Sequence, residues 1–450
     1  MYSNERKIEP GFAICLDGNN NFNSSLSLSN LTHSSRMSRS RLHPRIARTR
    51  PGLTDRIGYK SIHGLSSLIL LCSAVFSACS NNQSQNQSGT FGSSQPAVLS
   101  IEEVVRIGDE AAGDTVFFAY ISDIAVNNRG QIFIEEFQPT TIRVFDADGS
   151  YLADVGAVGS GPGEYSDPLF GGMFTGPADS FYVFDSWRRR HLSIYGPDQF
   201  EFVRSVPVPE YPVEEGDRVE NFGILGVVED GYIAHLRLVP SRRLVTAYRE
   251  TSEVIRIVNL DGSYGPVVAT GPGFEGVVAL RHVPLVGRKI PSANGIPFGR
   301  SMNWGLGSDG MLFSGWSDSI SIAVMSIYGP EEKHISLTHD PIPISDAEME
   351  DWLSHFGPEM RAKFGERGLH TTKPAYEELL VDDNNRVWLE LSATQESTDV
   401  EWIVLDMDSR VVGKVILPFG ARLKAIRGGR IYAVETKDGM PTVAVYELNV

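Results

Sequence analysis

Residues 121–156 read ISDIAVNNRGQIFIEEFQPTTIRVFDADGSYLADVG and contain four short apolar strands joined by two tight turns and one longer loop. The first turn is NNRG at 127–130, and the second is DADG at 146–149. Both turns carry the Asn, Asp and Gly that hairpins require for positive φ. The stretch therefore predicts one antiparallel sheet of four strands.

The same frame returns along the rest of the chain, and its last copy holds three strands instead of four. The residues just before each second strand are spaced by 50, 51, 79, 76 and 44 positions, at Gly130, Ser180, Gly231, Gly310, Arg386 and Arg430. Two of these spacings contain an insertion of about thirty residues beyond a blade-sized period. The pattern favours an all-β propeller of six blades over one of five or seven. A β-sandwich with so many strands would be unusual, and the coils of a β-helix are shorter than these units.

The incomplete last unit begins at Ala421 and has a ready donor for its missing strand. The apolar segment 98–106 precedes the first complete unit. Closing a ring with strands from both ends of the chain removes an open sheet edge that would otherwise aggregate. We therefore expect a six-bladed β-propeller over residues 98–450, with an N-terminal strand closing the last blade.

The first hundred residues differ from the rest in composition. Residues 1–60 are rich in Ser, Asn and Arg, and we expect disorder or sequence upstream of the true start. Residues 59–78 combine a basic beginning, a short apolar run and small residues, as in a secretory signal. The run is too short to span a bilayer as a helix. Residues 79–97 are polar and small, which predicts a flexible tether.

The cysteines and the charge limit the classes of partner. Cys15, Cys72 and Cys79 are the only cysteines, so a chain that matures at Cys79 keeps no second thiol for a disulfide or a metal site. Ten Lys and Arg and four Asp and Glu precede Cys79, which leaves 30 against 52 and a net charge of about −22 after it. Such an acidic body repels phosphate backbones, which argues against nucleic-acid binding. We expect a monomer.

Two segments resemble known families. Phe76-Ser77-Ala78-Cys79 resembles the lipobox of bacterial lipoproteins, and Ser80 follows in place of Asp. This resemblance implies acylation of Cys79 and an outer-membrane or cell-surface address. Residues 123–168, above all the DADG turn and GSGPGEY at 159–165, resemble the NHL-type repeat and the six-bladed propeller lipoproteins of bacteria. That resemblance implies a fold and an exported, membrane-anchored location, and it implies no chemistry.

Candidate site residues lie where a propeller usually carries function. Loops from strand 2 to strand 3, and from strand 4 to the next blade, share one face. We assign the 2–3 loops to 135–137, 185–191, 235–237, 315–318 and 434–437, and both insertions to the same face. The candidate ligand-binding residues are Asp185, Trp187, Arg188, Arg189, Arg190, His191, His235, Arg237, Arg281, His282, Trp316 and Asp318.

The arginines among them, with Arg288 and Lys289, gather positive charge on one face of an acidic protein. Because the planar guanidinium suits carboxylates and phosphates, one hypothesis is a small anionic ligand or a partner protein of the cell envelope. The alternative is that these charges are solvated or form salt bridges with neighbouring blades. Trp187 and Trp316 either stack on a sugar ring or cap blade cores.

The enzyme hypothesis is a lyase or hydrolase acting on a peptide, lactone or polysaccharide, with a divalent metal in the channel as one option. His191, His235 and His282 are candidate bases or ligands, and Glu135 is a further candidate acid. The histidines show no HxH or HExxH spacing, so the sequence itself requires no metal or other cofactor.

The second insertion predicts a short helical segment near 345–369. Ser345-Asp-Ala-Glu348 fits a capping box, and an apolar stripe runs from Met349 to Phe364 with a break at Gly357-Pro358. The stripe either packs on the propeller rim or forms a lid over the mouth of the channel.

Overall fold

The structure is a computed structural model that describes residues 96–109, 116–137, 139–169, 171–186, 190–213, 217–240, 251–283, 288–330, 332–394 and 396–449. Within these ranges, side chains are described except at residues 240, 278–283 and 288–293. The predicted signal segment, the lipidation site at Cys79 and most of the tether lie outside the described residues.

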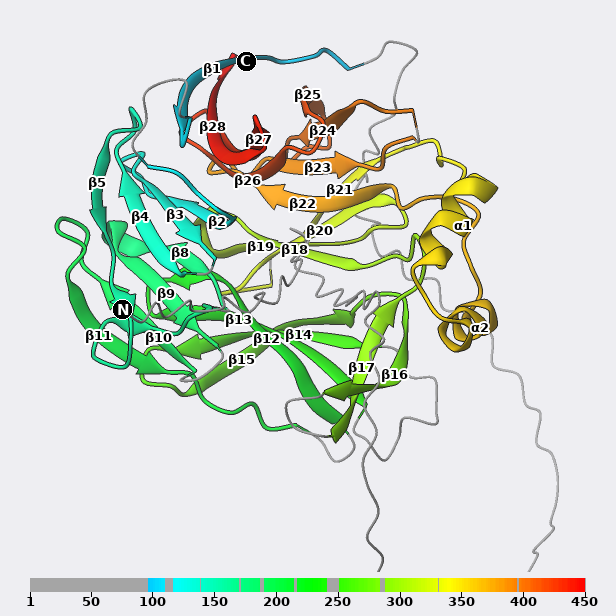
Figure 1. The fold of residues 1–450 in the computed structure, drawn as a ribbon, viewed down its shortest axis with the longest axis horizontal. Helices are drawn as coiled ribbons and strands as arrows, with labels where there is room; N and C mark the ends of the chain where they lie inside the picture. The colour runs from blue at the N-terminus through cyan, green and yellow to red at the C-terminus, as the bar shows by residue number, and fades with distance from the viewer. Residues whose placement is uncertain are drawn as a thin grey trace, which may run out of the picture. The chain divides into compact units, whose positions relative to one another are not determined.

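Six antiparallel sheets of four strands form the blades, which confirms the predicted propeller (Figure 1). From the inside outward, blade 1 has β2 (Ile121–Val126), β3 (Ile132–Glu136), β4 (Thr141–Phe145) and β5 (Tyr151–Asp154). Blade 2 has β8 (Met173–Thr175), β9 (Phe181–Asp185), β10 (His191–Tyr195) and β11 (Phe202–Pro207). Blade 3 has β12 (Asp217–Val228), β13 (Gly231–Pro240), β14 (Ser252–Asn259) and β15 (Tyr264–Pro272).

The remaining three blades follow the same plan. Blade 4 has β18 (Met302–Leu306), β19 (Met311–Trp316), β20 (Ile320–Ser326) and β21 (Glu332–Leu337). Blade 5 has β22 (Tyr376–Val381), β23 (Val387–Leu391), β24 (Asp399–Leu405) and β25 (Val411–Pro418). Blade 6 has β26 (Arg422–Arg427), β27 (Arg430–Lys437), β28 (Met440–Asn449) and, outermost, β1 (Ser100–Ile107). Short 3-10 turns lie at η2 (Pro177–Asp179) and η4 (Ser308–Gly310).

The blades pack side by side around a ring, and each junction has its own apolar core. First strands of neighbouring blades touch, as in β2 with β8, β12 with β18, and β26 with β2. Alternate residues of each strand face one neighbouring blade, which is why the period-2 pattern of the sequence specifies this packing. At the junction of blades 1 and 2, Phe133 and Phe181 stack with ring centroids 4.1 Å apart. At the junction of blades 5 and 6, Trp388 and Trp402 are completely buried.

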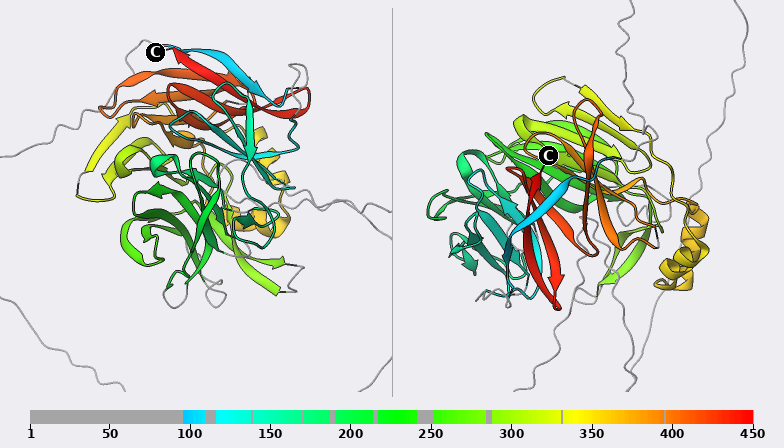
Figure 2. Two further views of the ribbon diagram at one scale, coloured as in Figure 1. Left: turned by 90° about the vertical axis from the view of Figure 1, so that its left-hand side faces the viewer. Right: turned by 90° about the horizontal axis from the view of Figure 1, so that it is seen from above.

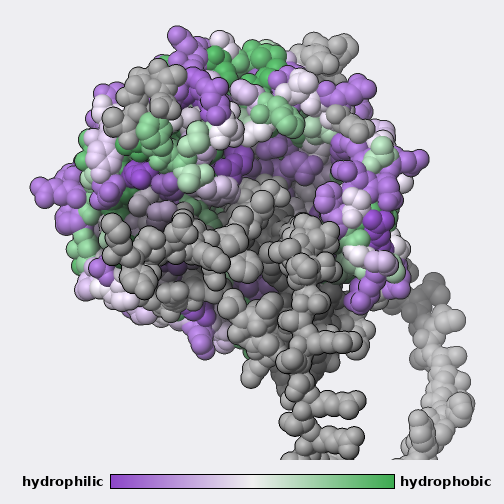
Figure 3. Space-filling model, in the orientation of Figure 1, coloured by the Kyte–Doolittle hydropathy of each residue, from purple (hydrophilic) through white to green (hydrophobic). Residues whose placement is uncertain are grey.

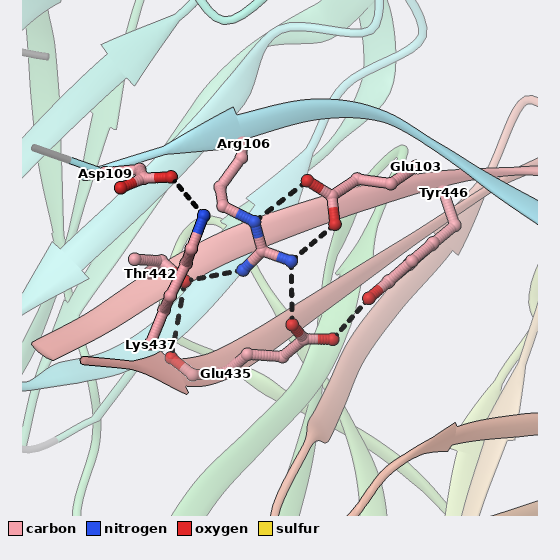
Figure 4. A network of polar contacts seen from close by, with 7 residues as sticks. All are labelled: Glu103, Arg106, Asp109, Glu435, Lys437, Thr442 and Tyr446. Atoms are coloured by element: carbon pink, nitrogen blue, oxygen red, sulfur yellow. Dashed lines mark hydrogen bonds and ion pairs between the residues drawn. The ribbon is translucent and has the colours of Figure 1, made fainter. Parts of the chain in front are cut away.

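The N-terminal strand closes blade 6, as predicted. β1 pairs antiparallel with β28 along its whole length. Arg106 of β1 donates hydrogen bonds to Thr442 Oγ1 and Glu435 Oε2, both at 2.9 Å, while Lys437 Nζ donates to Asp109 Oδ2 at 2.6 Å (Figure 4). The first and last strands of the propeller are therefore joined by backbone pairing and by charged side chains.

The chain just before β1 also holds blade 5. Leu99 N donates to Lys414 O at 2.8 Å, and Lys414 N donates to Ala97 O at 2.9 Å, so residues 97–99 lie along the outer strand β25. A Cβ on Gly413 would lie 2.6 Å from Leu99 Cδ2 and 2.9 Å from Ala97 O. Glycine thus allows the close approach here, and residues 97–107 join blade 5 to blade 6.

The two insertions pack against each other. The first is a hairpin of β16 (Gly276–Val283) and β17 (Arg288–Gly295), and the second contains α1 (Asp346–Ser354) and α2 (Pro358–Arg367) (Figure 2). Ser345 and Glu348 form the predicted capping box. Phe364 is completely buried in a small core with Val277 and Ile296, and Trp352 stacks on Phe356. The apolar stripe therefore contacts the other insertion, a partner that neither sequence-based alternative included.

Some predicted loop positions are wrong. His235 and Arg237 lie inside β13, and residues 434–437 lie inside β27. These strands continue beyond the point where the apolar pattern of the sequence ends, since ladder hydrogen bonds hold them. The glycine-rich linker at 159–165 directly follows β6 (Ala157–Val158) and ends in β7 (Glu164–Tyr165), and these two short strands pair in parallel.

Candidate functional site

The first strands of blades 1, 5 and 6 share a β-bulge near their beginning. The irregularities lie between Ile121 and Asp123 in β2, between Tyr376 and Glu378 in β22, and between Leu423 and Ala425 in β26. The extra residues are Ser122, Glu377 and Lys424. Bulges redirect side chains and are common next to active sites. Here they bring polar side chains from three blades into one region of the innermost strands.

Two pairs of carboxyl groups occupy equivalent positions beside these bulges. Asp123 of β2 lies directly opposite Glu135 of β3, and Glu378 of β22 lies directly opposite Glu390 of β23. Side chains opposite each other on antiparallel strands are close neighbours, and two like charges there are unfavourable. Each pair therefore favours a state in which at least one of its carboxyl groups is protonated.

Burial and neighbouring acids raise the pKa values of these groups. Burial, with the charge of Asp123, raises the pKa of Glu135 to about 8. Burial raises the pKa of Glu378 to about 8. Attraction to Lys424 lowers this pKa, and the charge of Glu390 raises it. Burial, with the charge of Glu377, raises the pKa of Glu390 to about 7. Burial also raises the pKa of Asp123. Perturbed carboxyl groups of this kind are typical of functional sites.

The positive charge of Lys424 acts on both carboxyl pairs. Its charge lowers the pKa values of Asp123, Glu135 and Glu378 and so partly offsets their burial. Arg422, from the same strand, acts similarly on Glu378. Blades 1, 5 and 6 therefore contribute to one coupled acid–base cluster.

A cavity of about 520 Å³ opens beside this cluster, over the junction of blades 5 and 6. Its polar walls include Glu377, Glu378 and Glu390, with Lys373 and Arg422. Its apolar walls are Phe298, Leu391, Val400, Phe419 and Ala421. Phe419 is 79% exposed, the largest fraction for any big apolar side chain among the described residues. In Figure 3 hydrophilic residues make up much of the coloured surface, and apolar residues form smaller patches among them.

The residues expected in blade 2 have structural partners where they are described. Asp185 is completely buried, and its Oδ2 accepts a hydrogen bond from Ser166 N at 2.9 Å. Arg190 donates to Pro209 O at 3.3 Å, and its guanidinium lies 5.3 Å from the centre of the Phe222 ring. His191 pairs with Asp185 in the strand ladder. Trp187, Arg188 and Arg189 lie outside the described residues.

The residues expected in blades 3 and 4 form two separate clusters. Glu253 accepts from His235 Nε2 at 3.0 Å, from Arg237 Nε at 3.2 Å and from Trp304 Nε1 at 2.7 Å. Asp318 accepts from Arg300 Nε at 2.9 Å, and Trp316 ends β19 nearby in sequence. Arg281, His282, Arg288 and Lys289 lie on β16 and β17, and their side chains lie outside the described part.

The predicted ligand-binding residues are therefore spread over blades 2 to 4 and the β16–β17 hairpin, and those with described side chains do not line the cavity at blades 5 and 6. Sequence reasoning identified Glu135 but missed Asp123, Glu378, Glu390 and Lys424. The available signal was the position of these charges. Each lies in a strand together with several apolar residues, in ISDIAV, YEELLV, VWLEL and ARLKAIR, and a charge that such a strand buries requires a reason.

Within the ranges given above, no group of three or more His, Cys, Asp or Glu residues is arranged to hold a metal ion. Helices there are also too short or too polar to cross a bilayer.

Comparisons with known proteins agree with the observed architecture. Residues 112–203 match a family model described as a 6-bladed beta-propeller, and no curated protein matches. This chain is a six-bladed β-propeller.

Solved structures with a similar fold include a Bacteroides fragilis protein assigned as exported, with 11% identity, a TM-score of 0.44, and coverage of 80% of this chain and 98% of that one. Another is an oligogalacturonate lyase of Vibrio parahaemolyticus, with 9% identity, a TM-score of 0.39 and coverage of 79% and 98%. A streptogramin B lyase has 10% identity, a TM-score of 0.36 and coverage of 78% and 98%.

Proposed function

We propose that this chain is an exported, lipid-anchored propeller that binds a small organic ligand in the cavity between blades 5 and 6. The observation that carries the proposal is the cavity itself. Its volume of about 520 Å³ lies within the range typical of small-molecule sites. Its lining also combines apolar walls with a few polar groups, which is the usual composition of such sites.

The described arginines of the loop face give less support to an anionic ligand. Arg237 and Arg300 are paired with the carboxylates of Glu253 and Asp318, and Arg190 lies against Phe222. An anion would compete with these partners. The anionic-ligand hypothesis, and that of a partner protein bound at the same face, now depend mainly on cations whose side chains lie outside the described part: Arg188, Arg189, Arg281, Arg288 and Lys289.

Replacing Phe419 with Ser tests the cavity. We expect this variant to weaken the binding of any ligand found by thermal-shift screening of a metabolite library by about tenfold, because an aromatic wall of the cavity is lost. The matched control is Tyr328→Ser, since Tyr328 is 67% exposed and lies in the turn between strands 3 and 4 of blade 4, on the opposite face. Equal affinity of both variants and the wild type would place the ligand elsewhere.

An enzyme is the second candidate, and the Glu378–Glu390 pair favours it. Carboxyl groups with pKa values of about 8 and 7 are matched to general acid–base work near neutral pH. A lyase or hydrolase acting on a peptide, lactone or polysaccharide would use such a pair. Mass spectrometry of substrate mixtures incubated with the wild type and Glu390→Gln tests this candidate. Products that form equally with both proteins would contradict it.

The anchor is tested at Cys79. We expect Cys79→Ala to move the protein from the membrane fraction to the soluble fraction, because acyl chains on this residue would supply the attachment. Cys72→Ala is the matched control, since it changes a cysteine within the apolar run of the signal. Mass spectrometry of the mature N-terminus identifies the lipid. Membrane retention of the Cys79 variant would show a different anchor.

A further inference from the structure

We infer that the ligand of the cavity carries an organic cation, an ammonium or guanidinium group on an apolar stem, which the Glu378–Glu390 pair receives. This inference rests on the proposed function and adds the chemical class of the ligand. Its basis is the set of hydrogen-bond partners that the charged groups of the cavity already have.

The two cations in the lining have partners of their own. Lys373 Nζ donates to Glu348 Oε1 at 2.5 Å and to Ala393 O at 2.6 Å. Arg422 donates to Ile121 O at 3.0 Å and lies over the Tyr120 ring. Both cations are thus directed toward groups beyond the carboxyl pair. They are poorly placed to receive an anionic ligand without losing these bonds.

The carboxyl groups outnumber the cations in the same lining. Glu377, Glu378, Glu390 and Asp399 line the cavity, against Lys373 and Arg422. Glu377 accepts a hydrogen bond from Ser392 Oγ at 2.5 Å. Glu378 and Glu390 face each other across neighbouring strands. A ligand cation between them would relieve their repulsion and gain charge-assisted hydrogen bonds.

An acidic pair alone would not identify a ligand, and here the apolar walls provide the second observation. Phe298, Leu391, Val400 and Phe419 surround the same space. A hydrated metal ion would gain nothing from these walls. An organic cation gains both apolar burial along its stem and attraction to the aromatic faces. The composition of the cavity therefore fits an amine or guanidine better than an inorganic ion.

Binding of such a cation is coupled to protons. The groups that act on Glu378 are Glu390 from β23, Arg422 and Lys424 from β26, and Asp123 from β2, while Glu377 acts on Glu390. The pKa values of Glu378 and Glu390 are raised to about 8 and about 7, so the pair retains protons near neutral pH. A bound cation favours the ionised carboxylates. Affinity should therefore rise as the pH rises through about 7 to 8, with protons released on binding.

Three probes with the same ring and different charges test the inference. They are 2-phenylethylamine, 2-phenylethanol and 3-phenylpropionate, titrated into the full mature protein by calorimetry in buffers of different ionisation enthalpy. We expect the amine to bind at least about tenfold more tightly than the alcohol at about pH 8, and the propionate most weakly. We also expect the advantage of the amine to shrink at about pH 6.

Two variants test whether Glu378 is the group that binds the cation. Glu378→Gln should remove most of the amine's advantage over phenylethanol and most of the proton release. Glu378→Asp should restore part of both. Asp408→Asn is the control, because Asp408 is exposed and pairs with Lys333 away from the cavity. A further arm compares 2-phenylethylamine with the blocked dipeptide acetyl-Phe-Lys-amide, which distinguishes a free amine from a lysine side chain as the source of the cation.

The outcomes separate the inference from the proposed function. Equal binding of the three probes, preference for the propionate, or binding of none of them would overturn the cationic class. A library ligand that binds the wild type and loses affinity in Phe419→Ser would still support the cavity as the site. If Phe419→Ser changes the binding of neither library ligands nor probes, the proposed site itself is wrong.

Discussion

A chain that begins at Gly108 will fail to form a stable monomer, whereas one that begins at Pro96 will be as stable as the longer chain. The first truncation removes β1 and the segment that lies along β25. It exposes apolar surface under Ile107, which is only 2% exposed, and removes Arg106 from Glu435. We expect a loss of at least about 5 kcal/mol, comparable to the total stability of an ordinary domain.

Urea unfolding and size-exclusion chromatography of the two truncated chains measure this effect. The Pro96 chain is the control, because it lacks only residues outside the described part and keeps every contact of β1. Removal of β1 would leave the edge of β28 unpaired, and such edges promote association. A Gly108 chain that remained monomeric, with the unfolding midpoint of the Pro96 chain, would show that β1 does not stabilise the ring.

The second prediction concerns pH and the buried acids. Glu378 has an ordinary pKa of 4.5 and a raised pKa of about 8 in the folded protein, so the folded state holds the proton more tightly than the unfolded chain. The resulting stabilisation is complete below about pH 4.5 and is lost as the pH rises through about 8. Glu135 behaves in the same way. We expect the free energy of unfolding to fall by roughly 2 kcal/mol for each group between about pH 5.5 and pH 8.5.

Glu378→Gln should remove one such contribution. The variant should be at least about 1 kcal/mol more stable than the wild type at about pH 8.5 and nearly equal to it at about pH 5.5, because glutamine is never ionised. Glu332→Gln, at a side chain that is 63% exposed, should change neither value. Urea titrations at both pH values measure the difference. A gain of the same size at both pH values would arise from packing and would contradict the ionisation argument.

The fold was predictable because the local sequence signals and the six-bladed ring favour the same structure. The Asn, Asp and Gly turns, alternating strands and regular spacing all indicate four-stranded blades. Gly130 and Gly149 have φ of 79° and 87°, which is what the two quoted turns require. The closure of blade 6 by residues 98–106 was also predictable from the sequence, because the last repeat unit lacked one strand.

The site was less predictable, for a physical reason. Which side chains meet near the centre depends on strand register, and a bulge of one residue changes it. The bulges beside Asp123, Glu378 and Lys424 leave no distinct pattern in one sequence. His235 and Arg237 illustrate the converse, since both lie on a strand that was predicted to have ended. The sequence identified the type of residue at many positions but not which of them come together.

The closure of blade 6 also has a consequence for the order of events during synthesis. Arg106 and Glu435 are separated by 329 positions, so their contact forms only after nearly the whole chain has emerged. Joining such distant segments requires a large loss of chain entropy and slows folding. In a chain exported before it folds, this delay would keep the ring open during translocation. In the exported form proposed above, the pairing of β28 with β1 would then complete the propeller on the far side of the membrane.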